Sequence, residues 1–286
     1  MVLLPYLSVL RFSGSDAGDF LHNQLSADIN ALASGESTFA CYCEPKGRVL
    51  ALVLVARKDS DYYMLMSTSL AGPVASRLKI YVMRSKVDIE ALEGCSILGL
   101  QSSDESAPPA DCIASVILPE SDDSYLIVDG DTAGEVNSAL QDAWKLAELE
   151  RGITWLCSET SGQFLPQMLG YDDLGAVNFR KGCYPGQEIV ARTHYLGKVK
   201  RHPRLLCTNA MICPDPLDTI EISSDDKPME AVITDCARRE DGGSCLFVVT
   251  RMNPAQKADK IAYNLSLIHI SEPTRRRDSS RMPSSA

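Results

Sequence analysis

Short apolar segments separated by turn-forming residues constrain the fold of this chain more than any other feature. Thr38 to Cys43 and Val49 to Ala56 are apolar, β-branched runs on either side of Pro45-Lys46-Gly47, a pattern typical of a β-hairpin. Leu3 to Phe12 and Tyr62 to Met66 predict two further strands. No run in the chain approaches the ~20 apolar residues of a membrane-spanning helix, so we expect no membrane partner.

Predicted helices are interspersed with these strands without a regular order. Asp16 to Leu25 predicts a short helix, and Ala71 to Val82 predicts a second. Ala133 to Glu150 has the clearest helical period, and Gly152 is placed to end it. Ser96 to Leu100 and Ser124 to Val128 predict strands. This mixed order, without a dinucleotide-binding βαβ unit, predicts an α+β fold.

The character of the sequence changes after Gly197, where short strand-like segments are separated by Pro, Asp and Gly. Such spacing favours a small barrel or a sandwich. The predicted strands are Lys200 to Cys207, Thr219 to Ile222, Met229 to Cys236 and Ser244 to Thr250. We therefore assign residues 1–199 to an α+β region that can contain two subdomains, and residues 200–264 to a β-rich C-terminal domain. From about Leu265 the chain resembles translated sequencing-adaptor sequence, which predicts a non-native or disordered tail at 265–286 and a truncated C-terminal domain.

Length and charge exclude some functional classes. With 286 residues the chain can bury a sizeable core and form two or three domains. Its net charge of −10 disfavours extended contact with phosphates, so we expect no direct nucleic-acid partner. Val2 to Leu10 is apolar but too short, and lacks preceding basic residues, for a signal peptide. We expect a monomer in the cytoplasm, or in the mitochondrial matrix if the source is eukaryotic.

The ten cysteines carry no zinc-binding pattern. The sequence has no C-x-x-C pair, and Cys41 and Cys43 would share one face of a strand, which makes a poor zinc site. A chain of this length without a secretion signal is typical of a compartment that keeps thiols reduced. We therefore expect reduced cysteines and no structural metal.

One thiol differs from the others because glycines and cations flank it. Cys183 lies between Gly182 and Gly186, just ahead of a segment of helix-forming residues. A thiol at the start of a helix meets unsatisfied backbone N–H groups, and nearby cations such as Arg180 and Lys181 add to their field. Such surroundings favour the thiolate, so the pattern predicts a reactive Cys183. A second interpretation stays open, because most lone cysteines are small buried apolar residues.

The segment around this thiol resembles the signature of a known family. The octapeptide Lys181-Gly182-Cys183-Tyr184-Pro185-Gly186-Gln187-Glu188 is similar to the KGCYxGQE motif of the YgfZ-type folate-binding proteins, which are related to the aminomethyltransferase (T-protein) of the glycine cleavage system. Further segments that resemble the family are Gly14 to Asp28, Cys43 to Arg48 and Ser161 to Gln167. The similarity runs from about Leu7 to Asn264. It implies a T-protein-like α+β body followed by a small C-terminal β-barrel.

The resemblance also implies a folate site in the central cleft between the body and the barrel. Tyr6 and Trp144 are similar in position to aromatic residues that contact folate in the family. Leu7 is an alternative to Tyr6, and Trp144 shares a helix face with Leu140, so it can also be a core residue. The motif residues expected to contact the ligand are Tyr184, Gly186, Gln187, Glu188 and Arg192. Glu188 has a second interpretation as an acid favoured in the first turn of a helix.

Basic residues gather between Arg192 and Arg204. The others in this cluster are His194, Lys198, Lys200, Arg201 and His202. The cluster is either a solvated basic turn or a cradle for a polyanionic ligand. It is also the one feature that favours a direct RNA-binding module, and a long basic stripe is missing.

The family assists maturation or repair of iron–sulfur enzymes, including one that modifies tRNA. The resemblance therefore implies a folate-dependent accessory factor, with tetrahydrofolate or another folate as cofactor and iron–sulfur enzymes as partners. The catalytic candidates are Cys183, as a thiolate in one-carbon, redox or transient cluster chemistry, and Lys181, as the cation that stabilises it. The alternative is a tetrahydrofolate-dependent aminomethyltransferase, which needs a carboxylate near the folate amines. Candidates by residue type are Asp88, Asp172 and Asp173.

Overall fold

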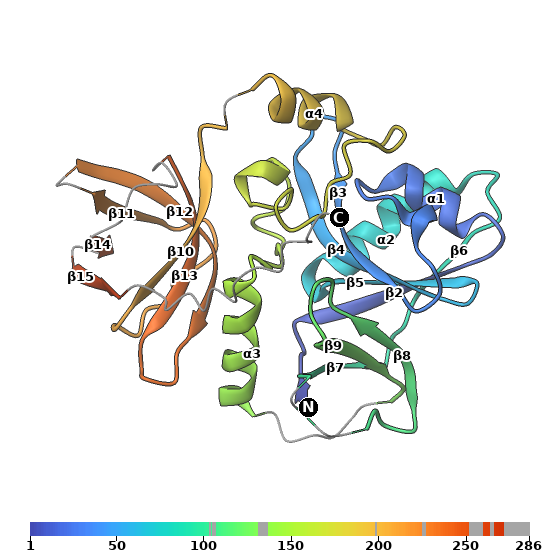
Figure 1. Cartoon of the computed structure of the whole chain (residues 1–286), viewed down its shortest axis with the longest axis horizontal. Coiled ribbons are helices and arrows are strands. Elements are labelled where there is room, and N and C mark those ends of the chain that lie inside the picture. The colour runs from blue at the N-terminus through green and yellow to red at the C-terminus, as the bar shows by residue number, and fades with distance from the viewer. Residues whose placement is uncertain are drawn as a thin grey trace, which may run out of the picture.

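The computed structural model describes residues 1–102, 104, 107–130, 137–197, 199–224, 227–251, 260–263 and 266–271. Two antiparallel sheets build an N-terminal body, and the C-terminal strands lie beside it with helix α3 (Ser138–Glu150) between them (Figure 1). Helix α3 contacts strand β12 (Lys227–Arg238) on the C-terminal side and strand β1 (Val2–Leu3) of the body. The prediction of an α+β fold is confirmed.

The larger sheet of the body has five antiparallel strands in the order β3-β4-β5-β2-β6. Their bounds are β2 Leu7–Ser13, β3 Ser37–Cys43, β4 Val49–Lys58, β5 Asp61–Ser67 and β6 Asp88–Ala91. Strand β4 is buried continuously from Ala51 to Ala56. Because both of its faces are covered, its sequence is an unbroken apolar run and does not alternate. The predicted hairpin is confirmed, and Gly47 makes its turn at φ 77°.

The prediction of a single strand from Leu3 to Phe12 is wrong. The structure divides this segment between β1, which pairs with β7 (Ser96–Leu100), and β2, which pairs with β5 and β6. Pro5 stands at the break, where it has no N–H to donate to either ladder. The turn at Pro5 and Tyr6 therefore joins two different sheets.

The smaller sheet of the body has the order β1-β7-β9-β8. Its remaining bounds are β8 Cys112–Ile117 and β9 Ser124–Val128. Strands β7 and β9 lie where the sequence predicts them. Strands β6 and β8 were not predicted; Ile89 is the one buried residue of β6, so its apolar signal is too weak to stand out.

The helices follow the predicted positions closely. Their bounds are α1 Ala17–Gln24, α2 Thr68–Val82 and α4 Gln187–Tyr195, with 3-10 turns η1 Ile29–Ala31 and η2 Pro166–Met168. The side chain of Asn137 caps α3 by accepting a hydrogen bond from the N–H of Leu140 at 3.2 Å. Gly152 follows the end of α3 at φ 78°, as predicted. Residues 133–136 of the predicted helix lie outside the described residues.

The C-terminal strands are joined in the order β10-β13-β12-β11-β14-β15, and β15 also pairs with β10, so this ladder closes on itself. The bounds are β10 His202–Thr208, β11 Thr219–Ser224, β13 Ser244–Thr250, β14 Lys260–Tyr263 and β15 Ser266–Ser271. The strands predicted between Lys200 and Thr250 correspond to β10 through β13. The buried side chains at the centre of this sheet are Leu206, Ile220, Ile222, Ala231, Ile233, Leu246 and Val248.

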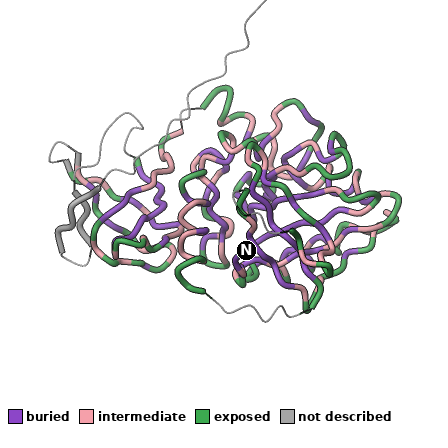
Figure 2. The backbone as a smooth tube through the Cα atoms, turned by 60° about the horizontal axis from the view of Figure 1, so that its bottom comes forward, coloured by how far each residue is buried: buried purple, intermediate pink, exposed green. Residues whose placement is uncertain are grey.

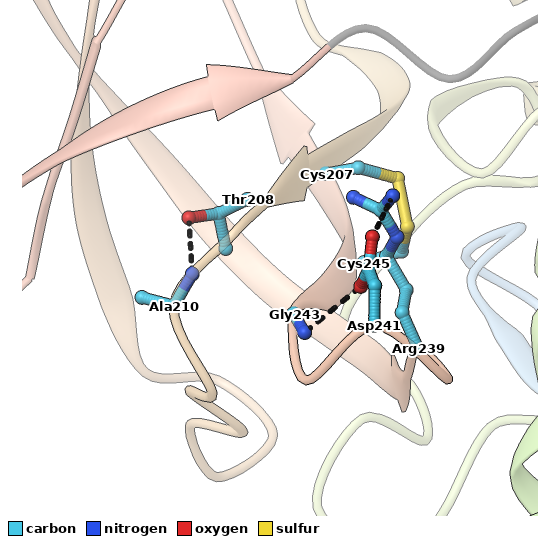
Figure 3. Close-up of a disulfide and its surroundings, with 7 residues drawn as sticks. All are labelled: Cys207, Thr208, Ala210, Arg239, Asp241, Gly243 and Cys245. Atoms are coloured by element: carbon cyan, nitrogen blue, oxygen red, sulfur yellow. Dashed lines mark hydrogen bonds and ion pairs between the residues drawn. A yellow bond between two sulfur atoms is a disulfide. The ribbon is translucent and has the colours of Figure 1, made fainter.

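The structure differs from the sequence prediction in the tail and in the cysteines. Residues 266–271, which the sequence analysis placed in a tail outside the fold, form β15, because the open edges of β10 and β14 offer backbone partners to an apolar segment. Residues 272–286 lie outside the described residues. The expectation of reduced cysteines is wrong for four of them, since Cys207 is bonded to Cys245 (Figure 3) and Cys213 to Cys236.

Both disulfides join residues that are distant in sequence. Cys207 and Cys245 are direct partners in the β10–β13 register, with Cα atoms 4.0 Å apart and a sequence separation of 38. Cys213 and Cys236 are separated by 23 residues. Analysis of local spacing cannot detect such cross-strand neighbours.

Buried residues run through the interior of the body, while exposed residues follow its loops (Figure 2). A smaller apolar cluster joins α3 to the C-terminal sheet: Leu149, with Leu146 beside it, packs with Ala237 and Phe247. Among the described helices, none is both long and apolar enough to cross a membrane.

Candidate functional site

Lys181 anchors the loop that carries Cys183. Its side chain is buried, and its Nζ donates hydrogen bonds to the backbone oxygens of His22 and, at 2.6 Å, of Leu25. These oxygens lie at the C-terminal end of α1, where carbonyl groups lack helical partners and a cation is favoured. Burial lowers the pKa of Lys181 to about 8, although Asp28 and Cys183 act in the opposite direction. Lys181 therefore holds the loop in place while burial works against its charge.

Two glycines fix the other end of the loop. Gly186 is the N-cap of α4 at φ 84°, and a Cβ atom there would lie 2.4 Å from the backbone oxygen of Glu44 and 2.7 Å from Cα of Gly47. A Cβ atom on Gly47 would in turn lie 3.0 Å from Cβ of Ile189. The β3–β4 turn and the start of α4 thus meet backbone to backbone, which requires glycine at both positions.

Cys183 is exposed between these two anchors. It precedes the first turn of α4, and Gly186 is the residue that caps the helix. The next residue, Tyr184, is buried, and its ring centroid lies 5.2 Å from Nζ of Lys181. Burial raises the pKa of the Tyr184 phenol. The buried side chain of Tyr184 therefore anchors the loop, while the adjacent thiol of Cys183 is exposed to solvent.

An imidazole and a carboxylate lie beside the same loop. A Cβ atom on Gly182 would be 3.9 Å from Nε2 of His22. Nδ1 of His22 is 3.1 Å from Oδ1 of Asp28, an ion-pair distance, although this nitrogen makes no hydrogen bond of good geometry among the described residues. Neither residue was predicted as a site residue, since α1 and the motif are far apart in the chain.

The remaining motif residues stabilise α4 and its entry. Gln187 donates from Nε2 to the backbone oxygen of Lys181 at 3.3 Å. Glu188 pairs with Arg192 one turn later at 3.0 Å, with both side chains largely exposed. This placement agrees with the interpretation of Glu188 as a residue of the first helical turn.

The structure divides the predicted basic cluster between two elements. His194 lies at the end of α4, where its ring stacks on Phe179 with centroids 3.8 Å apart. His202 and Arg204 belong to β10. Lys198 lies outside the described residues. The basic residues therefore do not form one continuous turn.

A pocket of about 320 Å³ lies between α3, the body and β12. It is lined by Tyr6, Ser67, Gln141, Asp142, Lys145, Trp155, Cys157 and Asp235. Its volume is at the lower end of the range for small-molecule sites. Tyr6 is the one predicted folate contact among its lining residues.

Glu148 is the central polar residue of this region, and the sequence analysis missed it. Its buried carboxylate accepts hydrogen bonds from the hydroxyls of Tyr125 at 2.6 Å and Tyr6 at 2.9 Å. It also accepts from the indole N–H groups of Trp155 at 3.0 Å and Trp144 at 3.2 Å. Burial raises the pKa of Glu148, and it also raises the pKa of Tyr6. One carboxylate thus orients four aromatic side chains.

Lys145 connects this carboxylate to the C-terminal sheet. Its Nζ lies 2.6 Å from Oδ2 of Asp235 on β12, 3.9 Å from Oε2 of Glu148 and 4.9 Å from the ring centroid of Tyr6. Burial disfavours its charge, but the neighbouring carboxylates of Asp235 and Glu148 prevail and raise the pKa of Lys145. The ammonium group therefore stays charged at the edge of the pocket.

Trp144 and Trp155 are both buried, with Trp155 4% exposed, but they have different neighbours. Trp144 is 3% exposed, and a Cβ atom on Gly99 would lie 2.7 Å from its ring. Trp144 is therefore packed against strand β7, as the core interpretation requires, and does not line the pocket. Trp155, which does line it, comes after the end of α3 and has no periodic pattern that would have marked it.

A second cavity of about 700 Å³ lies on the side of the β8–β9 turn, and Arg151, Asp173 and Phe247 are among the residues that line it. The three acids considered for transferase chemistry are dispersed: Asp173 lines this second cavity, Asp88 is exposed in β6, and burial raises the pKa of Asp172. Cys183 lines neither cavity. The structure thus places the motif loop and the pocket of Tyr6 at separate positions.

Comparisons with known proteins identify the class and then the family. The chain superposes on the glycine cleavage system aminomethyltransferase T from Bartonella henselae with a TM-score of 0.69 at 13% identity, covering 94% of this chain and 83% of that one. The fold is therefore that of the T-protein class. The chain is 30% identical over 288 residues to the tRNA-modifying protein YgfZ of Klebsiella pneumoniae, covering 91% of this chain and 87% of the relative.

A second relative agrees with this assignment. The tRNA-modifying protein YgfZ of Colwellia psychrerythraea is 28% identical over 301 residues, covering 93% of this chain and 92% of the relative. No protein-family model matches the chain. The chain belongs to the YgfZ family, as the motif around Cys183 predicted.

Proposed function

We propose that this protein binds a folate in the pocket of Tyr6, Lys145 and Trp155 and acts as an accessory factor in tRNA modification. The pocket carries the first part of the proposal: two aromatic side chains, both fixed by Glu148, line a cavity of about 320 Å³. Flat aromatic walls suit a ligand made of two ring systems. The relatives are named tRNA-modifying protein YgfZ, which supports the second part.

The proposal further assigns Cys183 to assembly or repair of iron–sulfur clusters in client enzymes. Its support is the KGCYxGQE motif, together with the exposure of a thiol whose loop is anchored on both sides. Folate and thiol then act at separate surfaces, with the folate in the pocket beside α3 and the thiol exposed to a partner protein. The accessory role thus requires both sites in one chain.

Calorimetric titration with tetrahydrofolate tests the folate site. Trp155→Ala should weaken binding by about 1–3 kcal/mol, the scale of a lost stacking partner. Tyr195→Ala, which removes an aromatic residue that is 64% exposed on α4, is the control and should bind like the wild type. Absence of binding to the wild-type protein would remove the folate from the proposal.

A complementation experiment tests the thiol separately. Cys183→Ala should bind tetrahydrofolate normally, since Cys183 does not line the pocket, yet fail to restore iron–sulfur enzyme activity in a strain that lacks the protein. Full restoration would exclude Cys183 from the mechanism.

A tetrahydrofolate-dependent aminomethyltransferase is the second candidate, favoured by the T-protein fold and by the carboxylate of Asp235 in the pocket. Transfer chemistry needs a carboxylate close to the reacting amines, and Asp235 is already paired with Lys145 at 2.6 Å. A glycine-cleavage assay that follows formation of methylenetetrahydrofolate separates the candidates. We expect no turnover.

A further inference from the structure

The pocket of Tyr6, Lys145 and Trp155 contains more negative than positive charge. Among its described lining residues, Asp142 and Asp235 are acidic and Lys145 alone is basic. The ammonium of Lys145 is 2.6 Å from Asp235 and 3.9 Å from Glu148, so carboxylates already balance it from two sides. An anionic ligand group that entered this pocket would meet net repulsion.

Asp235 retains the capacity to accept another hydrogen bond. Its Oδ2 accepts from Nζ of Lys145 at 2.6 Å and from Oγ1 of Thr154 at 3.3 Å, and its Oδ1 accepts from the N–H of Cys236 at 2.9 Å. An ionised carboxylate has about four lone-pair sites, so the described residues leave a site on Oδ1 for a ligand.

The aromatic residues of the pocket offer a ligand ring surface and no free donor. The hydroxyl of Tyr6 and the indole N–H of Trp155 both donate to Glu148, at 2.9 and 3.0 Å. Their polar atoms are therefore committed to the protein, so the ring surface that faces a ligand is carbon; Trp155 is 4% exposed, and the partly buried Tyr6 offers most of this surface. A flat heterocycle that carries N–H donors on one edge matches this combination of ring surface and acceptor.

We propose that Asp235 is the specificity-determining residue of this pocket and accepts one hydrogen bond, at Oδ1, from the 2-amino group of a flat 2-amino-4-oxopyrimidine ring. The inference rests on the proposed folate function, and it adds the orientation of the ligand. The pterin ring enters the pocket against Trp155 and Tyr6, and the anionic glutamate tail stays outside. Lys145 holds the Asp235 carboxylate in position.

The C-terminal sheet contributes directly to recognition in this arrangement. Asp235 belongs to β12, whereas Gln141, Asp142 and Lys145 belong to α3. The pocket is therefore complete only while β12 packs on α3, because the body alone lacks Asp235, the proposed hydrogen-bond acceptor for the ring.

Competition experiments on the wild-type protein test the orientation. The probes are pterin, lumazine (which has an oxygen in place of the 2-amino group) and p-aminobenzoylglutamate (the tail without the ring), each displacing tetrahydrofolate. Pterin should compete at least about tenfold better than lumazine, the effect of one hydrogen bond to a charged acceptor, and the tail fragment should compete least.

Variants assign the selectivity to Asp235. Asp235→Asn keeps the size of the side chain and should reduce the preference for pterin over lumazine to about twofold or less. Asp142→Asn, at the other acidic residue of the pocket, is the matched control and should retain the wild-type preference. The ratio of the two affinities is informative because a general loosening of the pocket lowers both affinities together.

The outcomes separate this inference from the proposed function. If tetrahydrofolate does not bind to the wild type, the folate function itself fails. If tetrahydrofolate binds but lumazine or the tail fragment competes as well as pterin, the orientation is overturned and the folate function stands. Because this comparison uses unmodified protein, it decides the question even if Asp235→Asn does not fold.

Discussion

Replacing Glu148 with alanine removes the buried acceptor that four aromatic side chains share. The carboxylate accepts hydrogen bonds from four aromatic side chains at distances from 2.6 to 3.2 Å. In Glu148→Ala these donors stay buried without that partner, and Lys145 keeps Asp235 as its remaining close carboxylate. The variant therefore tests whether one buried anion organises this region.

The expected loss of unfolding free energy is about 4 kcal/mol. Breaking a buried charged network by removing one partner costs about 3–5 kcal/mol, and each unsatisfied buried donor costs about 1–3 kcal/mol. Four donors would exceed the first range, but water that enters the vacated volume can satisfy part of them. Removal of a buried charge also recovers some desolvation free energy. The melting temperature should fall on the order of 10 °C.

Tryptophan fluorescence is a suitable assay because the chain has two tryptophans and both donate to Glu148. Urea unfolding followed by fluorescence and by circular dichroism should give the same loss, and the native emission should shift. Glu150→Ala, at an exposed position on the same helix, should change stability by less than about 0.5 kcal/mol. A loss below about 1 kcal/mol in Glu148→Ala, with unshifted emission, would refute the reasoning.

Three further predictions concern the motif loop. Gly186→Ala should lower the unfolding free energy by at least about 2 kcal/mol more than Gly175→Ala. Both glycines have φ near 80°, but an added Cβ atom would meet backbone atoms at Gly186 and open space at Gly175. Equal losses in urea titrations would contradict this prediction. Burial lowers the pKa of Lys181 from 10.5 to about 8. Between about pH 8 and pH 10.5 the folded protein therefore binds fewer protons than the unfolded chain, so the unfolding free energy rises with pH. The rise that Lys181 contributes should be absent in Lys181→Met. Iodoacetamide should label the exposed Cys183 faster than the buried Cys41 and Cys43, and mass spectrometry that found equal labelling would show that the loop is not open to solvent.

The elements that the sequence predicted well are those whose signal is local. The β3–β4 hairpin combines two apolar runs with a turn that contains Gly47, and α3 combines a helical period with Gly152 at its end. The helix start after Cys183 was also predicted correctly, since α4 begins at Gln187. The glycine that marks it, Gly186, is needed for the close backbone contact with Gly47. The wrong prediction of one strand from Leu3 to Phe12 also concerns a local signal, because Pro5 has no N–H group to donate to a sheet, and this can be read from the sequence.

The features that the sequence did not reveal depend on contacts between distant segments. Glu148 is important because its partners come from the body, from β9 and from the segment after α3, and none of these positions marks it in the sequence. Asp235 reaches the pocket because β12 packs against α3. The Cys207–Cys245 disulfide arises from the register of two strands. Periodicity and motif spacing carry no information about such neighbours.

The packing of α3 also bears on how the molecule behaves as a whole. Leu146 and Leu149 on this helix pack against Ala237 and Phe247 of the C-terminal strands. Lys145 on the same helix pairs with Asp235 of β12. If the chain were cleaved near residue 199 and the C-terminal part removed, the apolar side chains and the ammonium group of α3 that now contact it would be exposed to water. The border between the two regions is thus a change of sequence pattern, and because α3 packs across it we expect the two regions to unfold in one cooperative transition.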